Sequence, residues 1–529
     1  MNERFDQITA EIIKSALLYA SEEMGIAVRN SAYSPNIKER LDHSCALFDR
    51  RARLIAQAEH IPVHLGSLPW GLQTTLAEIE RVHGGAREGE MWVVNDPYLS
   101  GTHLNDVTVI RPVFFNGELV GYAANKAHHT DVGGMVPGSM PVDASELFAE
   151  GLVVPPMRLM RDNEPVAQTI ELFAANSRTP HARRGDLRAQ IAGNTTGERR
   201  MLELYERYGK AIVDASTERL LDESERRMRA AIRALGDGVF RSADVLEDRS
   251  GAPAIRIELQ LTLRDGEAHF DYAGTSAQLA FPMNAVYGVT LSGVHYALRA
   301  VTDPEIPMND GCFRPVRVDV PLGTLLNPRR PAPVSGGNVE TSTRNADVVL
   351  RAFAQAVPER VPACSGGTMS NVMLGGTRDD GTTWAFYETN GCGMGARPNA
   401  DGIDGIQCHM TNTLNTPIEA IEREFPLRIA RYEFAENTGG AGRYHGGNGL
   451  IRALQLMGGS ARATLLAERH TVPPPGTLGG KDGSCGNHER VAADGTSERI
   501  GAKVSVELTP GETIVVQTPG GGGYGAPSS

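Results

Sequence analysis

The sequence predicts an α+β fold, with a large mixed α/β N-terminal part and a β-rich C-terminal part. Residues 181–235 contain no proline and are rich in Arg, Glu, Leu and Ala, which is typical of long solvated helices. From Ile255 to Leu263 apolar and polar residues alternate strictly, which indicates a half-buried strand. Toward the C-terminus, short apolar runs are separated by glycine and proline turns. We therefore expect three regions: α+β over residues 1–240, mixed α/β over 241–424 and β-rich over 425–529.

The N-terminal elements follow from periodicity and turn residues. Residues 5–27 repeat apolar side chains at helical spacing and predict an amphipathic helix, and residues 68–83 predict a second helix. Between them, residues 40–65 predict two short strands joined by a turn at Asp49-Arg50-Arg51. Farther along, two apolar runs flank Asn116-Gly117, which is a strong signal for a β-hairpin.

The helical region 181–235 is expected to consist of two helices. Asn194-Thr195-Thr196-Gly197 combines residues with low helix propensity, so we place the break there. After the alternating run that ends at Leu263, Asp265-Gly266 predicts a tight turn into a second strand ending at Tyr272.

The remaining elements are helices in the middle of the chain and strands near its end. Residues 284–302 and 339–357 show helical periodicity. Residues 500–508 alternate like a strand, and Pro510-Gly511 turns into a last strand at 514–516. The 59 glycines gather in the second half of the chain, which implies tight turns or close backbone approaches there.

Composition and charge exclude several classes of protein. Lys and Arg total 52 and Asp and Glu total 64, so the net charge of −12 argues against a nucleic-acid surface. No run of about 18 apolar residues is present, so no membrane span is expected. The charged N-terminus lacks the pattern of a signal peptide. The six cysteines form no C-x-x-C pair, which favours free thiols in a reducing compartment, and we expect a cytoplasmic protein.

Histidine and aspartate gather at two places that can form a metal site. His103 and Asp106 form a His-x-x-Asp motif, which puts two ligands within one tight loop. Neutral imidazole and carboxylate are usual ligands of Zn, Mn or Fe in hydrolytic sites. His128 and His129 lie beyond the next predicted strand, which the predicted hairpin brings alongside, and Asp42 is a candidate fourth ligand. The alternative is that these are hydrogen-bonded turn residues, and the spacing alone leaves both interpretations open.

Other candidates carry less specific signals. Glu388 and His409 flank the glycine-rich segment 391–395 and can form an acid/base pair in a glycine-lined cleft. A glycine-rich hairpin with a hydrogen-bonded glutamate explains the same residues. The helix start after Gly336-Gly337 can hold an anion on its free N–H groups, although a capped helix start is commoner. Residues 476–482 lack the first glycine and the Ser/Thr of a phosphate loop, so no nucleotide site is expected in this chain.

Several longer motifs occur in order along nearly the whole chain. They are Glu39–Cys45, Asn95–Tyr98, Gly101–Val107, His128–Gly134, Gly337–Ser342, Gly367–Asn371, Met410–Thr413 and Pro519–Gly525. Taken together, these motifs resemble the hydantoinase B/oxoprolinase family. That family contains ATP-dependent hydrolases of cyclic amides such as 5-oxoproline, N-methylhydantoin and caprolactam. It also contains the larger subunits of acetone and acetophenone carboxylases.

The resemblance implies a division of labour between two kinds of subunit. A-type subunits carry an actin-like ATP site, and B-type subunits carry a metal site. The family pattern maps its metal ligands onto His103, Asp106 and His129, with His128 as the competing choice for the third position. Asp42 matches a further ligand position.

The resemblance therefore implies the B-type subunit of an ATP-dependent cyclic amidase. An A-type partner would bind ATP and Mg and phosphorylate the substrate, and a divalent metal (Zn, Mn or Fe) in this chain would activate water to open the ring. Asp131 or Glu388 would orient ligands or move protons, with His409 as a further candidate. The alternatives are a subunit of a ketone carboxylase of the acetone or acetophenone type, a structural subunit without chemistry, and a metal-dependent amidase that needs no ATP. A hetero-oligomer that acts on a small cyclic amide is expected.

Overall fold

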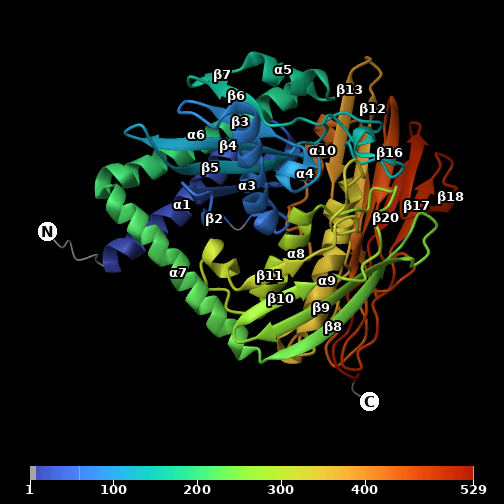
Figure 1. Ribbon diagram of the computed structural model, residues 1–529. Helices are drawn as coiled ribbons and strands as arrows, with labels where there is room; N and C mark the ends of the chain where they lie inside the picture. Colours follow the sequence, from blue (N-terminus) through green and yellow to red (C-terminus); the bar gives the residue numbers. More distant parts are fainter. Residues whose placement is uncertain (1–6, 59, 528–529) are drawn as a thin grey trace.

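A seven-stranded antiparallel sheet forms the core of the N-terminal part (Figure 1). The computed structural model describes residues 7–58 and 60–527. The strand order is β2-β1-β5-β4-β3-β6-β7. The strands are β1 (His43–Asp49), β2 (Leu54–Gln57), β3 (Met91–Val94), β4 (Asp106–Phe115), β5 (Glu118–His128), β6 (Met157–Arg161) and β7 (Glu164–Pro165).

Helices cover both faces of this sheet. They are α1 (Gln7–Ser31), α2 (Pro35–Lys38), α3 (His64–His83), α4 (Pro97–Ser100), α5 (Ala167–Ala175), α6 (Pro180–Tyr208) and α7 (Lys210–Ala234). Leu47 of β1 and Ala123 of β5 pack against α1 and α6. Their neighbours Ala46 and Ala124 face the other way and pack against α3. Because side chains alternate along a strand, neighbouring residues of these strands face helices on opposite sides of the sheet.

The sequence predicts most of these elements correctly. The helix within 5–27, the two strands around Asp49–Arg51, the helix at 68–83 and the hairpin at Asn116-Gly117 are confirmed, apart from residues 5 and 6, which lie outside the described residues.

The predicted break at Asn194–Gly197 is wrong, because α6 runs through it to Tyr208. Tertiary contacts compensate for the low propensity there. The Asn194 side chain donates to the Val109 carbonyl of β4 (2.9 Å), and Gly197 packs against Met24 of α1. The helical region breaks instead at Gly209, whose φ of +77° ends α6.

The central part contains a four-stranded sheet of order β11-β10-β9-β8, covered by helices. Its elements are β8 (Gly238–Leu246), β9 (Ile255–Arg264), β10 (Glu267–Asp271), α8 (Tyr287–Val301), β11 (Val316–Asp319), a π-helical turn η3 (Gly337–Thr341) and α9 (Ser342–Phe353). Three short 3₁₀ turns are η1 (Leu147–Ala149), η2 (Asp310–Phe313) and η4 (Pro358–Arg360). The predicted alternating strand, its Asp-Gly hairpin and the two predicted helices are confirmed, with α9 ending earlier than expected.

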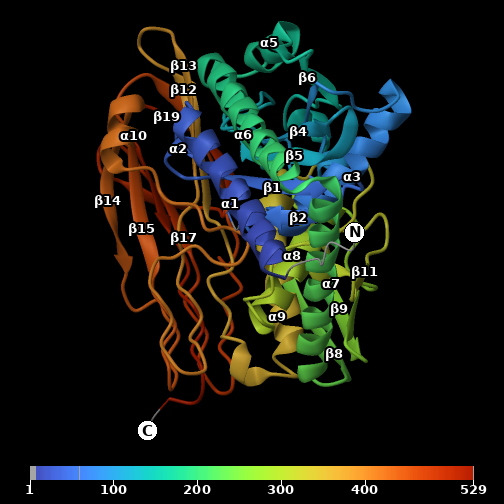
Figure 2. The same cartoon turned by 90° about the vertical axis from the view of Figure 1, so that its left-hand side faces the viewer.

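Two further sheets form the C-terminal part and lie as a layer along one side of the molecule (Figures 1 and 2). Their orders are β13-β12-β16-β19 and β14-β15-β20-β17-β18. The elements are β12 (Asn371–Thr377), β13 (Thr383–Glu388), α10 (Ile418–Glu424), β14 (Leu427–Ala435), β15 (Gly449–Leu456), β16 (Ser460–Leu466), β17 (Asn487–Val491), β18 (Ser497–Ile500), β19 (Lys503–Leu508) and β20 (Thr513–Gln517). Apolar side chains of both sheets share one core. The single strand predicted at 500–508 is divided, because Ile500 ends β18 and β19 begins at Lys503.

The α+β fold class is confirmed, and the C-terminal part is rich in strands as predicted. The three regional boundaries remain predictions. One C-terminal sheet takes β12 and β13 from the central region and β16 and β19 from the last one. Among the helices of residues 7–58 and 60–527, none is long and apolar enough to cross a membrane.

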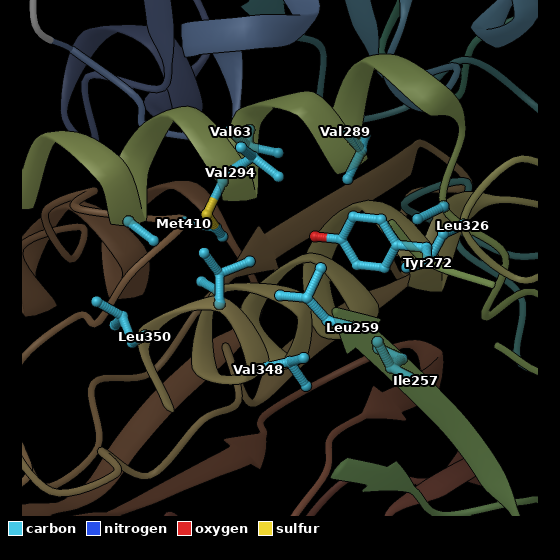
Figure 3. Packing of buried hydrophobic residues seen from close by; sticks show 14 of the residues in the cluster. Val63, Ile257, Leu259, Tyr272, Val289, Val294, Leu326, Val348, Leu350 and Met410 are labelled. Atoms are coloured by element: carbon cyan, nitrogen blue, oxygen red, sulfur yellow. The ribbon is translucent and has the colours of Figure 1, made fainter. Parts of the chain in front are cut away.

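The central sheet, helices α8 and α9 and the segments around residues 63 and 410 share one apolar core (Figure 3). Ile257 and Leu259 of β9 face Val348 of α9, while Val294 of α8 lies beside Val63 and Met410. Val63 immediately precedes α3, and its N–H donates to the Met410 carbonyl (3.2 Å). This core therefore fixes the position of the segment around residue 410 relative to the N-terminal sheet.

The glycine-rich segments of the C-terminal part pack backbone against backbone. The N–H of Gly521 donates to the Gly447 carbonyl (2.9 Å), and a Cβ added at Gly521 would lie 2.0 Å from the Met394 carbonyl oxygen. A Cβ at Gly393 would meet the Gly447 carbonyl oxygen at the same distance. The close backbone approaches expected from the glycine content are therefore present.

We expect Gly521→Ala to lower the free energy of unfolding by about 1–3 kcal/mol, because the new methyl group overpacks a buried backbone contact. Gly501→Ala is the matched control. A Cβ there meets only one atom, at 4.0 Å, and its expected effect is within about 0.5 kcal/mol. Denaturant unfolding of both variants measures the difference, and equal effects would contradict the packing described here.

A buried carboxylate lies at the start of the helical segment that contains Gly336-Gly337. Oε1 of Glu150 accepts the N–H groups of Val334 (2.8 Å) and Ser335 (2.9 Å). The free N–H groups at this helix start are therefore occupied by a side chain of the protein itself. Burial raises the pKa of Glu150 to about 7, although these hydrogen bonds oppose the shift.

This raised pKa predicts a pH-dependent stability. Between the unfolded pKa of about 4.3 and the folded pKa of about 7, the folded state keeps a proton that the unfolded state releases. Stability is therefore lost as the pH rises through this window. We expect Glu150→Gln to melt at a higher temperature than the wild type at pH 8, with the difference shrinking toward pH 5. Glu146→Gln, an exposed change nearby, is the control. A melting difference that is the same at both pH values would contradict the prediction.

Candidate metal centre

Three neighbouring strands bring the candidate ligands to one edge of the N-terminal sheet. Asp106 begins β4 and lies directly opposite His128, which ends β5. The N–H of His128 donates to the carbonyl of Asp42, just before β1 (3.0 Å). His103 lies one turn before Asp106, whose N–H donates to the His103 carbonyl (3.1 Å). All four side chains are buried.

The donor atoms of His103, Asp106 and His128 converge. Oδ1 of Asp106 lies 3.3 Å from Nε2 of His103 and 3.4 Å from Nδ1 of His128. The two ring nitrogens are 3.2 Å apart. In the described part of the chain, this is the one group of three His, Cys, Asp or Glu side chains whose ligand atoms all approach one another this closely.

The triangle has the size of one face of a tetrahedral metal site. With metal–ligand bonds of about 2.0–2.1 Å, tetrahedral ligand atoms lie about 3.3–3.4 Å apart. The three separations of 3.2, 3.3 and 3.4 Å match this value. Oδ2 of Asp42 lies 4.0 Å from Nδ1 of His128, close enough to supply a fourth ligand. The donor set therefore fits a divalent metal.

The protonation states also suit a metal. Burial raises the pKa of Asp106, but the histidines that face its oxygens outweigh burial and hold the pKa well below its usual range. Burial lowers the pKa of His128, and the carboxylate of Asp106 offsets this only in part. An ionised carboxylate and a neutral imidazole are the forms that bind metal ions.

Two further side chains hold these ligands in place. Nε2 of His64, at the start of α3, lies 3.4 Å from Oδ2 of Asp106, and its Nδ1 lies 2.8 Å from Oγ of Ser44. The ring of Tyr387, on β13, stacks on His128 at a centroid distance of 4.7 Å and an interplanar angle of 17°. Sequence reasoning missed both residues. His64 belongs to no metal motif, and Tyr387 is distant in the chain, so neither carries a local signal.

The structure brings His128, and not His129, to this cluster. His129 directs its ring to the other face of the sheet, where Nε2 lies 3.0 Å from Oε1 of Gln190 on α6. The two histidines separate because successive residues of an extended chain point to opposite faces. His128 shares the α3 face with Asp106, whereas His129 shares the α6 face with Ala127.

The predicted acid/base residues lie in separate surroundings. Asp131 is buried and accepts hydrogen bonds from Arg178 (3.0 Å) and from the N–H groups of Gly133 and Gly138, so it holds the loop that follows His129. The hydrogen bonds of its carboxylate go to this loop and to Arg178.

Glu388 and His409 are not paired with each other. Glu388 is buried in an ion pair with Arg452 of β15 and also accepts the N–H of Thr416. His409 has a different partner, Oδ1 of Asp347, 3.0 Å from its Nε2. Each of the two side chains therefore has a partner of its own, Arg452 for Glu388 and Asp347 for His409, and these interactions do not join them as an acid/base pair.

Comparisons with known proteins place these features in a family. The family model described as hydantoinase B/oxoprolinase matches residues 6–527. The chain is 33% identical to caprolactamase subunit beta of Pseudomonas jessenii over 99% of this chain and 91% of that subunit. It is 35% identical to 5-oxoprolinase 1 of Arabidopsis thaliana, over 98% of this chain but only 42% of that protein.

Two solved structures are also similar to this chain. The crystal structure of ATP-dependent caprolactamase from Pseudomonas jessenii matches with a TM-score of 0.92 and 32% identity, over 98% of this chain and 91% of that one. A nucleotide-free acetone carboxylase structure matches with a TM-score of 0.91 over 99% of this chain and 76% of that one. At 18% identity, this second likeness shows a shared fold alone.

The geometry predicts opposite effects for two adjacent histidines. If this cluster holds a metal, we expect His128→Gln to abolish metal binding, because its Nδ1 belongs to the ligand triangle. His129→Gln keeps the metal, because that ring lies on the α6 side. Elemental mass spectrometry of both variants, purified without chelator, measures this. Metal lost from His129→Gln and retained in His128→Gln would contradict the assignment.

Proposed function

The chain belongs to the hydantoinase B/oxoprolinase family, and we propose that it is the B-type subunit of an ATP-dependent enzyme that hydrolyses a small cyclic amide. The observation that carries this proposal is the ligand triangle of His103, Asp106 and His128. With Asp42 as a fourth ligand, these residues would hold a divalent Zn, Mn or Fe ion. Such an ion supplies Lewis acidity and lowers the pKa of a bound water, which is what attack on an amide carbonyl requires.

Side chains of this chain keep the proposed metal site buried and orient its ligands. Asp106 contributes a negative charge in a buried position, where an opposing cation is stabilised most strongly. His64 holds the second oxygen of that carboxylate, and Tyr387 fixes the plane of the His128 ring. We propose that Asp131 positions the loop after the ligands. We also propose that Glu388 positions Arg452 of β15, in the C-terminal sheet, through their ion pair.

Amide resonance explains why ATP enters the reaction. A ring amide resists attack because its nitrogen lone pair is delocalised into the carbonyl, and phosphorylation of the oxygen removes that protection. The sequence contains no phosphate loop, and the solved relative is named an ATP-dependent caprolactamase. We therefore propose that an A-type partner binds ATP and Mg, and that the two subunits form a hetero-oligomer.

The names of the relatives limit the proposed class of substrate. Their names point to a five-membered lactam (5-oxoprolinase) and a seven-membered lactam (caprolactamase), so we propose a small ring amide for this chain. All six cysteines are free thiols, which fits the cytoplasm as the proposed location. No observation of the site favours ketone carboxylation, since the acetone carboxylase likeness shows the fold alone.

Turnover of a lactam by the complex with the A-type partner tests this proposal. We expect His103→Ala to abolish ATP-dependent ring opening, because one ligand is lost. His64→Ala should lower kcat about 10–100-fold, because that residue only supports a ligand. His129→Gln is the control and should stay near the wild-type rate. Full activity of His103→Ala, or ring opening without ATP, would contradict the proposal.

A further inference from the structure

Two motifs of the family pattern come together in the fold. Gly337–Ser342 forms the π-helical turn η3 and the start of α9, and Gly367–Asn371 leads into β12. The first motif supplies Glu340 and the second supplies Asn371, and both side chains are fully buried. π-helical turns are rare and occur often at functional sites. The contacts of these two side chains therefore indicate what the motifs do.

A chain of hydrogen bonds joins these side chains to the metal centre. Oε1 of Glu340 accepts a hydrogen bond from Nδ2 of Asn371 (2.7 Å). Oδ1 of Asn371 accepts a hydrogen bond from the hydroxyl of Tyr387 (2.9 Å). The ring of Tyr387 in turn stacks on His128, a member of the ligand triangle. Glu340 is therefore connected to a metal ligand through two intervening side chains.

The amide of Asn371 has one possible orientation. Its Nδ2 also donates to the carbonyl of Leu466 on β16 (2.8 Å). Because a backbone carbonyl only accepts hydrogen bonds, the NH₂ group must face Leu466, and Oδ1 is left to face Tyr387. The hydroxyl of Tyr387 is consequently the donor in its pair with Asn371, and the outer end of the tyrosine ring is held in place.

The surroundings of Glu340 favour the neutral form of its carboxyl group. Burial raises the pKa of Glu340 well above its usual range, and the neighbouring carboxylate of Glu468 adds to this shift. Oε1 accepts hydrogen bonds from the N–H of Met369 (3.1 Å) and from Asn371. The neutral group therefore carries its proton on Oε2, and it presents Oε1 to Asn371 as the oxygen of an amide would.

A residue of the N-terminal part holds Tyr387 at two further points. The guanidinium of Arg40 lies over the ring of Tyr387, 4.8 Å from the ring centroid, and its Nη1 donates to the Tyr387 carbonyl (3.2 Å). Arg40 precedes Asp42, the proposed fourth ligand, by two residues. The hydroxyl, the ring face and the backbone of Tyr387 are thus each fixed by a contact. A ring restrained in this way also restrains the imidazole that stacks on it.

We propose that Glu340 and Asn371 are positioning residues of the metal centre, which fix through Tyr387 the direction in which Nδ1 of His128 faces the metal. This inference rests on the proposed function, because it concerns the metal site of that function. It gives two family motifs a role in which neither side chain touches the metal. Residues that support metal ligands typically change the metal affinity about 10–100-fold when they are replaced.

Zinc binding to the full chain without its partner tests this inference, and a second tyrosine supplies a matched control. Tyr272 is also buried, and its hydroxyl donates to Oδ1 of Asn345 (2.7 Å) in the central core. Tyr387→Phe and Tyr272→Phe each remove one buried tyrosine–asparagine hydrogen bond, so we expect similar losses of stability in denaturant unfolding of the metal-free chains. Only Tyr387→Phe should weaken Zn²⁺ binding, by about tenfold in competition with a chromogenic chelator.

Two variants of Glu340 test the far end of the hydrogen-bonded chain. Glu340→Gln keeps a neutral group with an acceptor oxygen for Asn371, so its Zn²⁺ affinity should equal that of the wild type. Glu340→Leu removes the acceptor, so its Zn²⁺ affinity should fall about tenfold. If Glu340→Leu does not fold, the comparison of the two tyrosine variants still decides the question.

The outcomes separate this inference from the proposed function. Wild-type Zn²⁺ affinity in Tyr387→Phe or Glu340→Leu, or equal weakening in Tyr387→Phe and Tyr272→Phe, would overturn the positioning role, as would Glu340→Gln binding as weakly as Glu340→Leu. In each case the loss of metal and of turnover in His103→Ala would still support the proposed function. A wild-type chain that binds no Zn²⁺ would overturn the metal centre and the positioning role together.

Discussion

A one-residue register shift between β4 and β5 decides which side chains form the candidate metal centre. Near the turn Phe115 pairs with Glu118, whereas farther along Asp106 pairs with His128, because the register slips between Val113 and Phe114. Without the slip, Asp106 would lie opposite Ala127, and His129 would share its face. A shift by one residue reverses the facing of the strand end. The pairing of Asp106 with His128 in the ligand triangle therefore depends on this bulge.

Parts of the chain that are far apart in sequence complete the site. The C-terminal layer lies against the N-terminal sheet (Figure 2), and its strand β13 supplies Tyr387, which stacks on His128. The hydroxyl of Tyr296, on α8, lies 3.4 Å from Nδ1 of His409, in the segment before Met410. Packing of Met410 against Val63 fixes this segment beside the start of α3. The chain therefore needs its whole fold to build the site.

Local signals in the sequence predict much of this structure, and non-local contacts account for what they miss. The Asn116-Gly117 turn and the alternation in β9 are short-range features, and both predictions are confirmed. His103 lies against Asp106, and Asp42 lies 4.0 Å from His128, as the motifs imply for one cluster. The choice between His128 and His129 needs the bulge, which no residue pattern signals. The continuity of α6 through Asn194 depends on a hydrogen bond to β4, which helix propensity cannot reveal.

A metal-edge X-ray absorption spectrum of the metal-loaded chain would identify the ligands of the metal. We expect nitrogen and oxygen ligands at about 2.0–2.1 Å from the metal, with outer scattering from two imidazole rings. Those rings are His103 and His128. Sulfur in the first shell, or scattering from one or three imidazole rings, would contradict the assignment.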